Sequence, residues 1–177
     1  MCGIAGVING GNPEILQKMA DIQAHRGPDD AGLKWFESAR SGLAQRRLSI
    51  LDLSSAGHQP MQNERGNRWI TFNGEIYNYR ELRAELQTKG YKFKSNSDTE
   101  VILAAYDEWG ASAVNRFNGM FALAIYDAET RELFLARDHL GIKPLYYAQL
   151  GETLLFASEA KALFEYPAME KEIEPDA

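Results

Sequence analysis

The stretch GMFALAIYDAETRELFLA, residues 119–136, decides the fold class of this chain. Residues 119–126 form an almost unbroken apolar run, and residues 133–136 form another after the polar segment Glu129-Thr130-Arg131. Two short apolar runs joined by a short polar segment predict a β-hairpin, whose strands pair antiparallel. The same pattern recurs around Gly151-Glu152, so we expect antiparallel sheet in the second half of the chain.

Upstream of this hairpin, two segments carry apolar residues at helical spacing. Residues 79–90 form the first, which ends at a glycine, a common C-terminal stop. Residues 101–109 form the second, which follows a polar segment in which Ser97 or Asp98 can cap the helix. Glu100, three residues after Ser97, can complete a capping box.

The front of the chain is rich in short apolar runs. We expect strands at residues 3–7, 33–36, 42–47 and 68–72, and a helix that starts at Asn12-Pro13. The last of these strands is expected to end at Asn73-Gly74-Glu75, because Asn-Gly is a common turn. Few strand–helix–strand alternations occur, which disfavours a doubly wound parallel sheet and predicts an α+β fold of antiparallel sheets with helices packed outside.

Length and composition narrow the class of protein. The 177 residues suit one domain, expected over residues 1–165, with a charged, proline-containing linker or tail over residues 166–177. A formal charge of -6 argues against nucleic acid as the main partner. No signal-peptide pattern and no bilayer-length apolar run occurs, so we expect a cytoplasmic protein without a membrane partner. A single cysteine and three scattered histidines give no metal-site pattern.

The single cysteine stands at position 2, directly behind Met1. Removal of a first methionine is favoured when the next residue is small, and it would leave a thiol and a free α-amine on one residue. An α-amine and a thiol have ordinary pKa values near ~7.7 and ~8.5, so such an amine can take the proton of the thiol and activate it as a nucleophile. While Met1 remains, that nitrogen is an amide and cannot act as a base. The alternative is an inert, buried cysteine at a strand start.

Three further clusters can bind the parts of an amino acid. Arg46 or Arg47 lies at a predicted strand end, where a guanidinium can grip a carboxylate or simply be solvated. Asn73-Gly74 can aim a side-chain amide and a backbone N–H into one pocket as an oxyanion hole, or can form a hairpin turn. Asp98 can receive an ammonium group or cap the helix that follows it. With Cys2 as nucleophile, the whole set would suit hydrolysis of the side-chain amide of glutamine.

The sequence resembles a known family, the class II glutamine amidotransferases of the N-terminal nucleophile hydrolase superfamily. The matching motifs, which keep the family's order to about Phe164, are Met1-Cys2-Gly3-Ile4-Ala5-Gly6, His25-Arg26-Gly27-Pro28-Asp29, Arg47-Leu48-Ser49-Ile50-Leu51-Asp52, Gln59-Pro60-Met61, Phe72-Asn73-Gly74-Glu75-Ile76-Tyr77-Asn78, Ser97-Asp98-Thr99-Glu100, Gly119-Met120-Phe121-Ala122 and Arg137-Asp138-His139-Leu140-Gly141-Ile142-Lys143-Pro144-Leu145-Tyr146-Tyr147. Sister branches of the family have a histidine before Asn-Gly, whereas Phe72 supports the asparagine synthetase branch. The resemblance implies a four-layer αββα sandwich of two antiparallel sheets flanked by helices.

The resemblance also implies a role for each matching residue. Cys2 would attack the amide and pass its proton through the α-amine. The Asn73 side chain and the Gly74 N–H would hold the tetrahedral oxyanion. The residues implied in substrate binding are Arg47 for the α-carboxylate, Glu75 and Asp98 for the α-ammonium, and Leu48 and Ile50 beside them.

The implied function is hydrolysis of glutamine to glutamate and ammonia through a Cys2 thioester. The implied partners are glutamine and a C-terminal synthetase domain that uses the ammonia, most readily to make asparagine from aspartate, and a homodimer is allowed. No cofactor is expected in this domain; ATP and Mg²⁺ would belong to the missing synthetase domain, since no P-loop or dinucleotide fingerprint occurs here. The alternatives are a sugar or another acid as acceptor, or a catalytically silent regulatory or assembly module.

Overall fold

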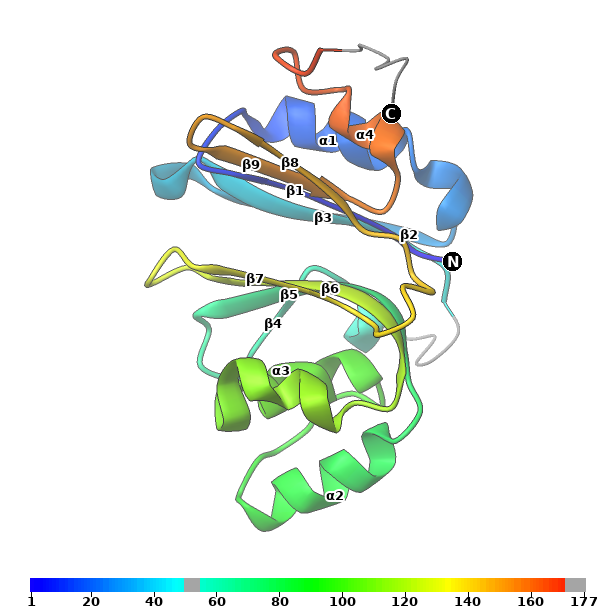
Figure 1. Ribbon diagram of the computed structural model, residues 1–177. Helices are drawn as coiled ribbons and strands as arrows, with labels where there is room; N and C mark the ends of the chain where they lie inside the picture. Colours follow the sequence, from blue (N-terminus) through cyan, green and yellow to red (C-terminus); the bar gives the residue numbers. More distant parts are fainter. Residues whose placement is uncertain (50–54, 171–177) are drawn as a thin grey trace.

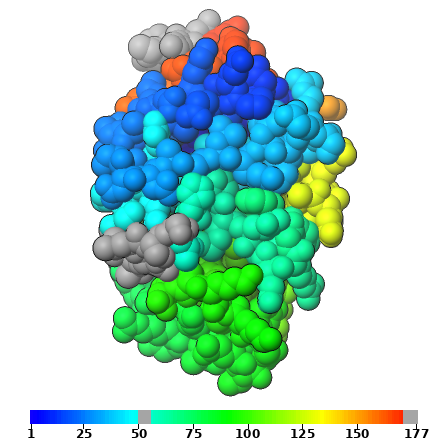
Figure 2. All heavy atoms as spheres, turned by 180° about the vertical axis from the view of Figure 1, so that it is seen from behind, coloured from blue at the N-terminus to red at the C-terminus, as the bar shows by residue number. Residues whose placement is uncertain are grey.

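Two antiparallel sheets lie face to face, and each is covered on its outer side by helices (Figure 1). The computed structural model describes residues 1–49 and 55–170. Seen from behind, the first third of the chain forms the upper part of the molecule and the green helical region the lower part (Figure 2). The expected α+β class and the four-layer αββα arrangement are confirmed.

The first sheet has five strands in the order β2-β3-β1-β9-β8, and every neighbouring pair is antiparallel. Its strands are β1 (Gly3–Ile8), β2 (Asp30–Phe36), β3 (Ser41–Arg47), β8 (Tyr146–Leu150) and β9 (Thr153–Ala157). The N-terminal strand β1 therefore lies in the middle, between β3 and β9. Helices α1 (Pro13–Asp21) and α4 (Ala160–Leu163) cover the outer face of this sheet (Figure 1).

The second sheet has four strands in the order β4-β5-β6-β7. Its strands are β4 (Met61–Gln62), β5 (Arg68–Ile76), β6 (Gly119–Asp127) and β7 (Leu133–Arg137). The predicted hairpin of residues 119–136 is the pair β6–β7, with Ala124 opposite Leu135. Helices α2 (Tyr79–Thr88) and α3 (Asp98–Trp109) cover its outer face (Figure 1).

The helix starts follow the expected capping chemistry in two of three details. Asn12 caps α1, because its side-chain oxygen accepts the Ile15 N–H at 2.9 Å. Ser97, not Asp98, caps α3 through the Thr99 N–H. The expected capping box is wrong, since the Glu100 carboxylate instead accepts the N–H groups of the preceding loop, from Lys94 and Ser95.

The expectation that a strand ends at Asn73-Gly74-Glu75 is also wrong. Strand β5 continues through all three residues to Ile76 and pairs with β6 along its whole length, with Gly74 opposite Phe121. The physical reason is the close approach of β6, because a Cβ atom on residue 74 would lie 2.2 Å from the Met120 carbonyl oxygen. The glycine therefore permits tight strand pairing rather than a turn.

Three apolar clusters fill the layers. One packs α2 and α3 against the second sheet, and another packs α1 and α4 against the first. The cluster between the sheets consists of Ile4, Ile8, Leu43, Ala122, Ala124, Tyr126 and Phe156. No helix within residues 1–49 and 55–170 is both long enough and apolar enough to cross a bilayer.

Candidate active site

The N-terminus lies at the end of the molecule where the β7–β8 connection passes from one sheet to the other (Figure 1). A small pocket of about 80 Å³ opens there. Its lining includes Met1, Cys2, Arg47, Leu48, Asn73, Gly74, Glu75 and Asp98. The structure thus brings together seven of the eight predicted site residues; the eighth, Ile50, lies outside the described residues.

Cys2 immediately precedes β1 and is half-buried, and its sulfur meets the backbone of Leu48. The Leu48 N–H donates to Sγ at 3.4 Å, and the thiol donates to the Leu48 carbonyl oxygen at 3.6 Å. A backbone N–H directed at sulfur is suited to stabilising a thiolate. The contact also places residue 48 of the predicted substrate-binding set against the nucleophile by its backbone rather than by its side chain.

The main chain of Cys2 is held by Arg26. The Arg26 Nε donates to the Cys2 carbonyl oxygen at 2.9 Å, and its Nη1 donates to Glu159 at 3.1 Å. Burial alone raises the pKa of Glu159, but hydrogen bonds from Lys161, Arg26 and His25 outweigh it and lower the pKa to about 2. The carboxylate therefore stays charged near neutral pH and keeps Arg26 in place.

Asn73 and Gly74 come from the middle of a paired strand, which fixes their direction. Asn73 is 1% exposed, and within the described residues its Nδ2 is a buried donor without a hydrogen-bond partner. Buried polar groups normally find partners, and an unmet donor costs about 1–3 kcal/mol. A side-chain amide kept in this state beside Cys2 is poised to donate to something that enters the pocket.

Asp98 lies in the first turn of α3 and is buried. Burial raises its pKa to about 6, and the nearby Glu75 carboxylate adds to this rise, while the N–H of Ile76, which donates to Asp98 Oδ2 at 3.0 Å, opposes it. The Glu75 and Asp98 carboxylates thus line one pocket, and each disfavours the charge of the other. A substrate ammonium would relieve this repulsion.

Arg47 ends β3 and is 7% exposed, so the guanidinium belongs to the pocket wall rather than to a solvated surface. The carbonyl oxygen of Arg47 accepts the Asp29 N–H at 3.0 Å, which ties the end of β3 to the preceding loop. The neighbouring Arg46 instead pairs with Asp21 at 2.6 Å on the helix side. The alternation of side chains along a strand separates the two arginines, and Arg47 is the one that faces the pocket.

Several lining residues were not predicted. They are Gly57, Gln59, Ser97, Thr99, Met120 and Lys143. Lys143 is 7% exposed and lies in the β7–β8 connection, where its N–H donates to Asp138. All but Gly57 stand in the motifs quoted above, but their residue types do not by themselves indicate a place in the pocket. Within the described residues, no group of three or more His, Cys, Asp or Glu side chains could hold a metal ion.

The sequence of this chain is similar to those of known proteins. A family model described as a glutamine amidotransferase domain matches residues 1–177. Asparagine synthetase [glutamine-hydrolyzing] 2 of Bacillus subtilis (strain 168) is 47% identical over 174 residues, which cover 94% of this chain and 23% of the relative. Asparagine synthetase [glutamine-hydrolyzing] 1 of the same organism is 45% identical over 170 residues, which cover 92% of this chain and 26% of the relative.

A solved structure, glutamine phosphoribosylpyrophosphate (PRPP) amidotransferase from B. subtilis complexed with ADP and GMP, is similar in fold. The TM-score is 0.78 at 21% identity, over 92% of this chain and 43% of that chain. At this identity the similarity concerns the fold alone. The chain spans about a quarter of the length of the two curated relatives described above.

Proposed function

The chain belongs to the glutamine amidotransferase family, and from that premise we propose that it hydrolyses the side-chain amide of glutamine to glutamate and ammonia. One observation carries the proposal. The buried, unpartnered Nδ2 of Asn73 lines the same pocket as the Cys2 thiol, so a nucleophile and a waiting anion donor share one space.

In the proposed reaction the Cys2 sulfur attacks the side-chain amide carbon of glutamine. The carbonyl oxygen becomes an oxyanion, which the Asn73 Nδ2 and the Gly74 N–H stabilise by hydrogen bonds made most strongly at that stage. The nitrogen takes a proton and leaves as ammonia, so that a γ-glutamyl thioester with Cys2 remains. Water then attacks the thioester and releases glutamate with the thiol restored.

The polar ends of the pocket suit the α-substituents of glutamine. Arg47 supplies a guanidinium for the α-carboxylate. Asp98 supplies a buried carboxylate for the α-ammonium, and Glu75 adds negative charge beside it. These assignments give the substrate one orientation, with its side-chain amide toward Cys2.

Removal of Met1 is part of this proposal. Met1 is 55% exposed and lines the pocket, so it is accessible to a processing enzyme and occupies space near the nucleophile. Its loss would free the α-amine of Cys2, which can then carry the proton from the thiol to the leaving nitrogen.

The fate of the ammonia is the wider part of the proposal. The two curated relatives are named as glutamine-hydrolysing asparagine synthetases and are about four times as long as the matched region. We infer a synthetase partner domain that uses ATP and Mg²⁺ and passes the ammonia to an activated acid, with aspartate as the favoured acceptor. A free ammonia product would otherwise be protonated in water and lost to the second reaction.

The test combines intact mass with product analysis. The purified chain is incubated with a glutamine-mimicking diazoketone, and glutamate formation from glutamine is measured in parallel. We expect loss of Met1, one covalent adduct on the only cysteine, and glutamate release; Cys2→Ala should lose both the adduct and the product. A processed chain that forms neither adduct nor glutamate would contradict the proposed hydrolysis.

A further inference from the structure

The outer edge of β5 lacks a neighbouring strand where it borders the pocket. Strand β4 pairs with β5 only at Trp69 and Ile70. Beyond Ile70, no other strand in the described parts of the chain pairs with this edge. The backbone groups that point outward from the next residues must therefore find other partners or remain open to the pocket.

The hydrogen-bond pattern identifies these outward groups. The Tyr77 N–H donates to the Asn118 carbonyl oxygen on the β6 side at 2.7 Å. Because antiparallel residues alternate between facing the partner strand and facing away, Glu75 and Asn73 also bond to β6. The main-chain groups of Phe72, Gly74 and Ile76 then point to the open edge.

Side chains replace the missing strand on both sides of Gly74. Gln59 Oε1 accepts the Phe72 N–H at 2.8 Å, and Gln45 Nε2 donates to the Phe72 carbonyl oxygen at 2.7 Å. On the other side, Asp98 accepts the Ile76 N–H at 3.0 Å. These three side chains leave the N–H between them, that of Gly74, directed to the pocket.

Gln59 also joins this edge to the helix that carries Asp98. Its Nε2 donates to the Thr99 hydroxyl at 3.0 Å, one residue after Asp98 in the first turn of α3. Gln59 is 5% exposed and Gln45 is 1% exposed, so neither bond competes freely with water. One carboxamide thus fixes both the strand edge and the start of the helix.

We propose that Gln59, assisted by Gln45, is a positioning residue that holds the outer edge of β5 so that the Gly74 N–H serves as an oxyanion donor. The role rests on the proposed glutamine hydrolysis. Gln59 lines the pocket, but its carboxamide oxygen is bonded to the Phe72 N–H and its nitrogen to the Thr99 hydroxyl, so it acts through these two residues. Without it the Phe72 N–H is buried without an acceptor, and the strand edge must shift to recover one.

The decisive variant is Gln59→Met, which keeps the length of the side chain but removes its acceptor and donor. Removing an oxyanion donor outright costs ~10²–10³ in rate, so misplacing one is expected to lower kcat by about 10- to 100-fold. The KM for glutamine should change less than threefold, because Arg47 is untouched and Asp98 keeps its own bond to the Ile76 N–H. The matched control is Gln62→Met, since Gln62 is exposed and its side chain, among the described residues, bonds the Gly66 carbonyl oxygen in the neighbouring turn.

Two readouts separate positioning from general damage. Alkylation of the thiol by iodoacetamide is a direct displacement that forms no oxyanion, and with one cysteine in the chain it is followed by intact mass. The rate of this alkylation should be the same in Gln59→Met as in the wild type. Amide hydrogen exchange should accelerate at Phe72 in this variant and remain unchanged in Gln62→Met, whether or not the chain is active.

The outcomes are distinct. An inactive wild type would overturn the proposed function, while the exchange at Phe72 still tests the edge. An active, folded Gln59→Met with wild-type kcat, or one whose kcat and alkylation rate fall together, would overturn the positioning role. Should Gln59→Met fail to fold, Gln59→Glu keeps an acceptor for Phe72 and is expected to stay within about tenfold of wild-type kcat, whereas Gln45→Met should lose more.

Discussion

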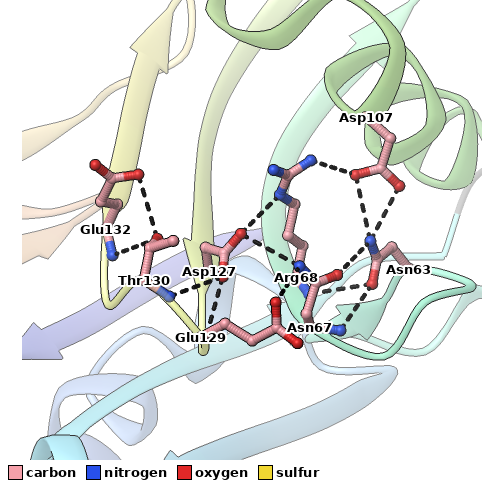
Figure 3. Close-up of polar contacts among 8 residues, drawn as sticks. All are labelled: Asn63, Asn67, Arg68, Asp107, Asp127, Glu129, Thr130 and Glu132. Atoms are coloured by element: carbon pink, nitrogen blue, oxygen red, sulfur yellow. Dashed lines mark hydrogen bonds and ion pairs between the residues drawn. The ribbon is translucent and has the colours of Figure 1, made fainter.

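The two ends of β5 differ in whether their buried polar groups have hydrogen-bond partners. At its first residue, the guanidinium and the backbone N–H of Arg68 are paired within a dense network (Figure 3). Five to seven residues later, at Asn73-Gly74-Glu75, donors point into a pocket. Asp98 lines the same pocket, and burial raises its pKa to about 6. One end of β5 thus stabilises the fold, whereas the other end lowers its stability and faces the pocket.

The Arg68 end is a closed network. Arg68 donates to Asp107 at 2.6 Å and to Asp127 at 2.9 Å, while Asn63 donates to Asp107 and accepts the Arg68 N–H (Figure 3). Although burial opposes both changes, these hydrogen bonds raise the pKa of Arg68, and bonds from Thr130, Arg68 and Glu129 lower the pKa of Asp127. Both shifts favour the charged, paired forms.

The pocket end leaves its polar groups unsatisfied until something binds. The Asn73 amide has no acceptor in the described structure, and burial favours the neutral form of Asp98. Within β5, a buried donor without a partner, rather than a polar side chain as such, distinguishes the pocket end from the Arg68 end. Mutations at the Arg68 end should therefore change the free energy of unfolding, and mutations at the pocket end should change kcat or KM.

The largest effect is expected for Asn73→Ala. Loss of one oxyanion donor should lower kcat by ~10²–10³. The melting temperature should stay within a few degrees of the wild type, because the lost Nδ2 made no hydrogen bond in the described structure. The change in kcat is measured by steady-state glutamate release, and the melting temperature is measured by calorimetry. A variant that melts far lower while keeping kcat would reverse the comparison.

Arg68→Leu should show the opposite profile. Removing the cation leaves the Asp107 and Asp127 side chains, 7% and 9% exposed, without their partner. Since the Arg68 side chain is itself partly exposed, we expect a loss of about 2–3 kcal/mol rather than the larger cost of a fully buried pair. That corresponds to roughly 4–12 °C in melting temperature for a chain of this size.

The kcat of folded Arg68→Leu should lie within twofold of the wild type. The matched control is Lys89→Met, which breaks the more exposed pair with Glu108 and should change the melting temperature little. Equal destabilisation by the two variants would show that the network of Figure 3 adds nothing to an ordinary surface pair.

Asp98→Asn should separate binding from stability at the pocket end. Asparagine can still accept the Ile76 N–H but cannot attract an ammonium, so the KM for glutamine should rise about 10- to 100-fold. The wild-type carboxyl has its pKa raised from 3.8 to about 6, which makes its ionised form a cost near pH 7. We therefore expect the variant to be more stable by about 1–2 kcal/mol, measured by denaturant unfolding. A destabilised variant would refute this cost.

The smallest effect is that of pH on glutamine binding, measured by calorimetry with Cys2→Ala. Because the pKa of Asp98 is about 6, lowering the pH from 7 to 5 neutralises most of this carboxylate and should weaken binding about tenfold. The sign for stability is opposite: a raised carboxyl pKa means that the folded state binds the proton more tightly, so stability from this group rises as pH falls from 7 toward 4. Asp98→Asn should show neither trend.

Much of this arrangement follows from local sequence, and the part that does not is long-range. The hairpins, the Asn12 cap and the end of α2 depend on neighbours in the chain, and each was predicted correctly. The path of β5 through Asn73-Gly74 was not, because Asn-Gly is a turn signal and only the backbone of β6 shows why the glycine is needed.

The candidate site divides in the same way. Cys2, Asn73 and Asp98 carry distinctive chemistry and could be chosen from the sequence, although their roles remain predictions. The supporting roles of Gln45 and Gln59 could not be predicted, because they depend on the backbone group that each side chain contacts in the fold. Here these groups are the carbonyl oxygen and the N–H of Phe72. The residues that support a site are harder to predict than those that act in it.

The central place of β1 has a consequence for the newly made chain. At ~5–20 residues per second, a ribosome needs roughly 8–30 s to reach Ala157 after β1 is complete, and until then β9 cannot pair with one side of β1. Until then β1 can pair with β3 but not with β9, so one edge of the N-terminal strand stays open. The proposed removal of Met1 can therefore take place before the donor strand β5 and the closing strand β9 assemble around Cys2.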